Sequence, residues 1–117
     1  MKKILLVLFM CCLCCGCGKK DELITYIEAK EKIINNSAIL IDVRTQEEYD
    51  TDHINGAILL PLNSIDEESA SAIFGTKDAE IILYCQSGNR SSQAKEKLKE
   101  LGYNNVHDLG AMSNWEE

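Results

Sequence analysis

Cys85 is the residue of this sequence that is best placed to do chemistry. It directly follows an apolar run, and the short loop Gln86-Ser87-Gly88-Asn89 separates it from Arg90 and a helical pattern. Backbone N–H groups in such a loop, together with a helix N-terminus, attract anions, and a glycine lets the backbone turn back on itself. These donors and the guanidinium of Arg90 should favour the reactive thiolate of Cys85. The pattern therefore favours a nucleophilic cysteine over a buried structural one.

The elements that must position Cys85 follow from the hydrophobic pattern. Continuous apolar runs at 38–43 and 80–84 predict strands buried on both faces, and an apolar stripe with helical spacing predicts a helix over 91–101. The remaining expected elements are strands at 23–27, 57–60 and 105–108 and helices at 28–35, 46–50 and 65–74. Short buried strands that alternate with helices predict an α/β domain, with a mainly parallel sheet of about five strands flanked by helices on both faces. Ligands of such sheets bind beyond the carboxyl ends of the strands, where Cys85 lies.

Several further motifs occur in a fixed order along the chain. They are Leu40-Ile41-Asp42-Val43-Arg44, Glu48-Tyr49, His53-Ile54-Asn55-Gly56-Ala57, Cys85-Gln86-Ser87-Gly88-Asn89-Arg90-Ser91, and the closing Gly110-Ala111-Met112 with Trp115. Together they resemble the rhodanese (sulfurtransferase) family over about residues 24–115. The match departs from the family pattern at Ala111, where a second glycine is usual.

The resemblance implies roles for the residues in these motifs. Cys85 would attack a sulfane sulfur donor, become a persulfide and pass the outer sulfur to a thiol or a cyanide-like acceptor. The backbone N–H groups from Gln86 to Ser91 (Gln86, Ser87, Gly88, Asn89, Arg90 and Ser91) would stabilise the charged persulfide, and Arg90 would help to bind a small sulfur-containing anion such as thiosulfate. Asp42 and Arg44 would form a buried polar support beneath the loop. The family match makes His53 architectural, and it implies no cofactor.

Three alternative functions remain open. Related phosphatases and arsenate reductases use a loop that is one residue longer, with arginine six positions after the cysteine, whereas Arg90 is five positions after Cys85. A non-catalytic binding module is the alternative from another class, although such modules usually lack the cysteine. A thiol or persulfide relay with a partner protein begins with the same thiolate, so the sequence does not separate it from simple sulfur transfer.

Composition excludes other classes of protein. The 117 residues suffice for one domain, and the formal net charge of −7 disfavours nucleic acid as a partner. We expect no metal site, because the two histidines, His53 and His107, are isolated from other good ligands. We expect a monomer, because the sequence indicates no exposed apolar helix face that demands a partner.

The N-terminal residues 1–17 resemble a signal peptide with a lipobox. Two lysines precede an apolar stretch over 4–15, which as a helix would span roughly 18 Å, less than the hydrocarbon core of about 30 Å. Gly16-Cys17 then resembles a lipobox, with Cys14 where leucine is usual. We therefore expect a lipid on Cys17, a polar linker at 18–23 and a domain at 24–117, held on the outer side of the cell membrane. The alternative is a soluble secreted protein. After cleavage and lipidation, Cys85 would be the sole free thiol.

Overall fold

A four-stranded parallel sheet forms the centre of the protein. The computed structural model describes residues 22–116, so the expected leader and Cys17 lie outside the described residues. The strand order is β2-β1-β3-β4, and every pair of neighbours is parallel. The strands are β1 (Ile39–Asp42), β2 (Ile58–Leu59), β3 (Ile81–Cys85) and β4 (Val106–Ala111). The α/β class and the parallel sheet expected from the alternating pattern are therefore confirmed.

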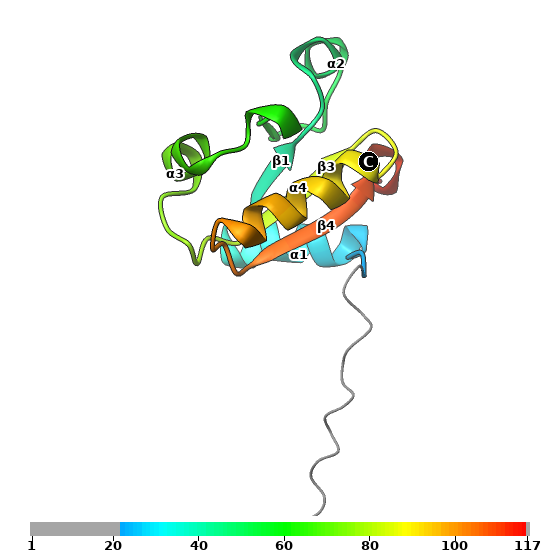
Figure 1. Ribbon diagram of the computed structural model, residues 1–117. Coiled ribbons are helices and arrows are strands. Elements are labelled where there is room, and N and C mark those ends of the chain that lie inside the picture. The colour runs from blue at the N-terminus through cyan, green and yellow to red at the C-terminus, as the bar shows by residue number, and fades with distance from the viewer. Residues whose placement is uncertain (1–21, 117) are drawn as a thin grey trace, which may run out of the picture.

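Helices connect the strands and lie on both sides of the sheet (Figure 1). Four are α-helices and two are single 3₁₀ turns among the described residues. They are α1 (Tyr26–Asn36), α2 (Gln46–Thr51), η2 (Leu62–Ser64), α3 (Glu67–Phe74), α4 (Asn89–Glu100) and η3 (Met112–Asn114). The expected helices at 28–35, 46–50, 65–74 and 91–101 all correspond to one of these elements, with ends that differ by one or two residues.

The strand expected at 23–27 is wrong. Thr25 instead caps α1: its hydroxyl accepts from the Glu28 N–H at 3.1 Å, and the Glu28 carboxylate accepts from the Thr25 N–H at 2.9 Å. This reciprocal capping box starts the helix inside the run that had strand-like composition. Ile24 makes one sheet-like contact, because its N–H donates to the Asp108 carbonyl at 3.0 Å. The described residues consequently form four strands rather than about five.

Side chains of β3 alternate between two hydrophobic clusters. Ile81, Leu83 and Cys85 face the cluster under α3 and α4, whereas Ile82 and Tyr84 face the cluster under α1. All five residues of β3 are buried. A strand that is buried on both faces has a continuous run of apolar residues. The sequence of β3 therefore predicted this strand clearly.

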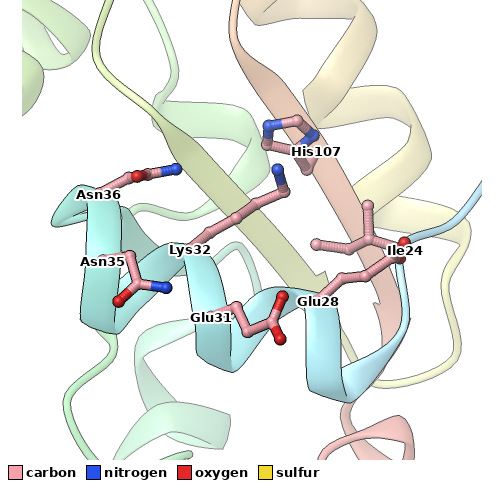
Figure 2. A pocket seen from close by; sticks show the side chains of 7 residues that line it. All are labelled: Ile24, Glu28, Glu31, Lys32, Asn35, Asn36 and His107. Carbon is pink, nitrogen blue, oxygen red and sulfur yellow. The ribbon is translucent and has the colours of Figure 1, made fainter.

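The polar contacts that hold α1 against the sheet gather at Glu80, the residue before β3. Its carboxylate accepts from Asn36 Nδ2 at 3.2 Å and lies 3.5 Å from Lys32 Nζ and 2.6 Å from His107 Nε2. Burial is the largest single effect on the pKa of Glu80 and acts to raise it, but the contacts with His107 and Lys32 together lower this pKa below its ordinary value. Figure 2 shows Lys32, Asn36 and His107 around the pocket between α1 and β4. Over residues 22–116 no helix has the length and apolarity needed to cross a bilayer.

Candidate functional site

Cys85 ends β3 and lies directly before the turn into α4. Its side chain has 0% exposed surface. The neighbouring strand β4 continues alongside, with Ala111 paired to Cys85, and its register shifts after Leu83 so that Gly110 pairs with Tyr84. The cysteine therefore lies at the carboxyl edge of the sheet, where the alternating pattern placed a site.

The sulfur of Cys85 accepts two backbone hydrogen bonds from its own loop. The Gly88 N–H donates to Sγ at 3.0 Å, and the Ser91 N–H donates at 3.3 Å. The Ser91 hydroxyl is 3.6 Å from the same sulfur and donates to the Gly88 carbonyl at 3.2 Å. Two backbone N–H donors directed at one sulfur stabilise negative charge on that atom. Of the N–H groups expected to do this, those of Gly88 and Ser91 point at Sγ.

Helix α4 begins without a capping side chain. Gly88 occupies the cap position with φ +104°, and no side chain there bonds to the first turn. By contrast, α1, α2 and α3 each begin with a capping box. The N–H of Ser91, in the first turn of α4, is thus available to the sulfur. The backbone turn requires glycine because of its positive φ, and a Cβ there would lie 3.8 Å from Gly110 Cα.

The remaining side chains of the loop face outward. Gln86, Ser87 and Asn89 are exposed. The Gln86 side-chain oxygen accepts from Arg44 Nη1 at 3.2 Å, and Asn89 Oδ1 accepts from Gln93 Nε2 at 3.1 Å. The side chains of Gln86 and Asn89 therefore make hydrogen bonds at the surface of the loop, while the backbone supplies the donors to Cys85.

Arg90 is paired with a carboxylate. Its Nη1 donates to Glu48 Oε1 at 2.8 Å and its Nη2 donates to Glu48 Oε2 at 3.1 Å. The pair joins the first turn of α4 to α2, and the side chains are 33% and 34% exposed. The hydrogen bond to Glu48, more than any other contact, raises the pKa of Arg90. The guanidinium expected to bind an anionic donor is thus occupied by a carboxylate.

Asp42 and Arg44, the expected polar support of the loop, form a buried ion pair, and Arg44 also contacts Gln86 of the loop. Arg44 donates to both Asp42 oxygens, with its Nη2 at 2.8 Å from Oδ2, and Nη2 also donates to the Asp52 carbonyl at 2.7 Å. The bond to Asp42 is the main cause that raises the pKa of Arg44. Tyr84 adds a donor to Asp42 Oδ2 at 2.7 Å and accepts from the Ile54 N–H at 3.1 Å.

Two residues of this arrangement had no predicted role. Tyr84 was assigned only to a strand, and Glu48 was quoted only as part of a motif. Each contacts a partner 42 residues away in the chain, a separation that no local spacing reveals. His53 is exposed and stacks on Tyr49 with ring centroids 3.7 Å apart, outside the polar network under Cys85. Within residues 22–116, no group of three His, Cys, Asp or Glu side chains is arranged to hold a metal ion.

Comparison with known sequences gives a consistent family. The family model described as "Rhodanese-like domain" matches residues 25–117. Thiosulfate sulfurtransferase PspE of Escherichia coli is 42% identical over 72 residues, which cover 62% of this chain and 68% of that protein. Thiosulfate sulfurtransferase GlpE of Coxiella burnetii is 30% identical over 93 residues, which cover 79% of this chain and 84% of that protein.

Solved structures agree with the sequence comparison. The human single-domain sulfurtransferase TSTD1 superposes with a TM-score of 0.67 at 25% identity, covering 80% of this chain and 93% of that one. A rhodanese from E. coli solved with anions gives a TM-score of 0.60 at 39% identity, covering 66% and 89% of the two chains. With the matching sequence, sheet and cysteine loop all in place, the chain belongs to the rhodanese-like domain family.

Proposed function

We propose that this rhodanese-type sulfurtransferase carries the transferred sulfur on Cys85 as a persulfide. The observation that supports it is the pair of backbone N–H groups, from Gly88 and Ser91, that donate to Cys85 Sγ. These donors stabilise the Cys85 thiolate, which is the form that attacks a sulfur donor and the form that leaves when the acceptor takes the outer sulfur.

The reaction has two displacement steps that balance without an added oxidant or reductant. The Cys85 thiolate attacks the outer sulfur of a donor such as thiosulfate, a new S–S bond forms, and sulfite leaves with the electron pair of the broken S–S bond. A thiolate or cyanide acceptor then attacks the outer sulfur of the persulfide, and the Cys85 thiolate leaves. Asp42 and Arg44 act on neither sulfur; they support the loop through Gln86.

Access to the sulfur requires a local movement, because Cys85 has 0% exposed surface. The loop that follows it includes Gln86, Ser87 and Asn89, whose side chains are exposed. Segments of this kind open at low cost in free energy compared with the core. The donor would thus reach Cys85 by displacing the loop rather than the strands.

Treatment of the purified protein with thiosulfate is expected to add one sulfur atom to its intact mass. Peptide mapping should place this atom on Cys85, and cyanide should remove it as thiocyanate. Because the mapping separates Cys85 from the N-terminal cysteines, it also excludes sulfur bound elsewhere. A protein that gains no sulfur from thiosulfate or from any other sulfane donor would contradict the proposal.

A second candidate function is that of a non-catalytic binding module. The complete burial of Cys85 favours it, because inert structural cysteines are buried in this way. The two candidates differ in an accessible measurement, the reaction of Cys85 with a small alkylating reagent in the folded protein. An opening loop gives labelling far faster than global unfolding, whereas a structural cysteine is labelled only at the rate of unfolding.

We also infer that the protein is exported and anchored by a lipid on Cys17. The support is the order of lysines, apolar stretch and Gly16-Cys17 in the sequence. A lipid anchor would place the domain on the outer surface of the cell membrane, with the polar linker 18–23 between them.

Metabolic labelling with a fatty-acid analogue is expected to mark the wild-type protein and not the Cys17→Ser variant. Serine cannot form the thioether that attaches the lipid, so label and membrane association should disappear together. A matched Cys15→Ser variant, two positions away, should keep the label. Label that persists after Cys17→Ser would contradict the lipid anchor.

A further inference from the structure

The Arg90–Glu48 ion pair affects which sulfur donors the site can bind, because it determines the charge that the site presents to them. Glu48 accepts hydrogen bonds from both terminal nitrogens of the guanidinium, so its carboxylate offsets the positive charge with which Arg90 would attract an anion. The hydrogen bond from Arg90, followed by that from the Thr45 N–H, lowers the pKa of Glu48 to about 2. The carboxylate is therefore ionised over the whole neutral range, and the pair persists there.

Glu48 is itself held in place by the start of α2. The Thr45 N–H donates to Glu48 Oε1 at 2.9 Å, and the Thr45 hydroxyl donates to the same oxygen at 3.1 Å. The Glu48 N–H donates back to Thr45 Oγ1 at 3.2 Å, completing a capping box. The carboxylate that occupies Arg90 is thus fixed by its own helix and does not swing away freely.

The surrounding segments add no free cation for a donor. Residues 42–53 and 85–91 carry five carboxylates and two arginines, a net charge of −3. The second arginine, Arg44, is 2% exposed and is paired with Asp42. A donor with two negative charges, such as thiosulfate, would therefore approach a negatively charged rim whose guanidinium groups are both occupied.

We propose that Glu48 is a specificity-determining residue, which by occupying Arg90 selects against dianionic donors and in favour of sulfane donors with no net negative charge. The inference rests on the proposed function, because it concerns the sulfur that Cys85 takes up. With a persulfide donor, the Cys85 thiolate bonds to the terminal sulfur, the S–S bond of the donor breaks, and the donor thiolate leaves. A donor of this kind has no net negative charge, so its binding does not depend on the guanidinium of Arg90.

The test compares rates of sulfur loading on Cys85 from thiosulfate and from cysteamine persulfide, whose ammonium group offsets its negative charge. Glu48→Gln removes the negative charge that is paired with Arg90 but keeps the capping box, which accepts glutamine at this position. The rate constant for thiosulfate is expected to rise about five- to tenfold, the equivalent of releasing one exposed ion pair of about 1 kcal/mol. The rate constant for cysteamine persulfide should change less than about twofold.

Two control variants separate the pair from the general charge of the rim. Glu47→Gln removes the same charge from the adjacent, exposed position and leaves the Arg90–Glu48 pair intact. It should change either rate less than about twofold at physiological salt, because exposed charges are screened. The double variant Glu48→Gln/Arg90→Gln should lose the gain seen in Glu48→Gln, since that gain acts through the guanidinium.

The outcomes distinguish a failure of the Glu48 proposal from a failure of the proposed function. An unchanged or lower thiosulfate rate in Glu48→Gln, with normal loading of the wild type, would overturn the role of Glu48 and leave the persulfide function standing. An equal gain in Glu47→Gln would also overturn it, in favour of the overall charge of the rim. Absence of loading from both donors in every variant would overturn both proposals.

Discussion

Replacement of Cys85 by serine is expected to abolish sulfur loading and to lower sulfite release from thiosulfate by at least about a thousandfold. A serine hydroxyl is far less acidic than a thiol, so the two N–H donors from Gly88 and Ser91 would face a neutral oxygen. The measurement is the steady-state release of sulfite, with intact mass as the second readout. Serine is nearly the same size and can accept the same hydrogen bonds, so the fold should be retained.

Ser91→Ala is the matched control for this variant. It removes the hydroxyl that lies 3.6 Å from Cys85 Sγ and keeps the backbone N–H that donates to the sulfur. Its activity should fall less than about tenfold, the cost of one neutral hydrogen bond. If Cys85→Ser retained sulfur transfer within tenfold of the wild type, the nucleophile would have to be sought elsewhere.

Asp42→Ala is expected to lower the free energy of unfolding by about 3–5 kcal/mol, because it leaves a buried charge without its partner. Asp42 has 0% exposed surface and accepts hydrogen bonds from Arg44 and from the Tyr84 hydroxyl. Both donors are buried, with exposed fractions of 2% for Arg44 and 0% for Tyr84, so the lost acceptor is not readily replaced by solvent. Urea unfolding of the purified variant at neutral pH measures the loss directly, as a lower midpoint with an unchanged slope.

Asp50→Ala provides the comparison for this loss. Asp50 is an exposed carboxylate on α2 that accepts from Gln46, so its removal should change stability by no more than about 0.5 kcal/mol. A loss below about 1 kcal/mol in Asp42→Ala would mean that Arg44 finds other partners, and the buried network would not be the support of the loop.

The accuracy of the predicted fold depended on how each element is buried. The runs at 38–43 and 80–84 are apolar on both faces because both faces of the sheet are covered, so their patterns were unambiguous. The run at 23–27 is apolar and rich in β-formers, but a local signal of higher specificity, threonine followed three residues later by glutamate, starts α1 there. Hydrophobic composition therefore predicted a strand, whereas the capping box in the same segment would have predicted the start of a helix.

In the candidate site, the features that are local in the sequence could be predicted, and the contacts between distant segments could not. The loop from Cys85 to Arg90 is contiguous, so its spacing alone predicted a turn before a helix with donors near the sulfur. The partner of Arg90 is different: Glu48 comes from another connection at the carboxyl edge of the sheet, and only the parallel pairing of the strands brings the two segments together. The prediction that Arg90 binds an anionic donor rested on its charge and its place in the loop, and it stays a prediction; the structure adds that Arg90 has a carboxylate partner.

If Cys17 carries the lipid proposed above, the position of Leu23 would determine which side of the domain faces the membrane. Leu23 lies close to Gly110, where an added Cβ would be 3.1 Å from Leu23 Cδ1, and Gly110 in turn neighbours Gly88 of the cysteine loop. A linker that begins at a lipidated Cys17 would therefore join the domain on the side that carries the cysteine loop. Six linker residues reach at most about 20 Å. Sulfur carriers anchored in the same membrane would be confined to the same layer next to its surface. They would therefore meet Cys85 at a higher effective concentration than carriers in bulk solution.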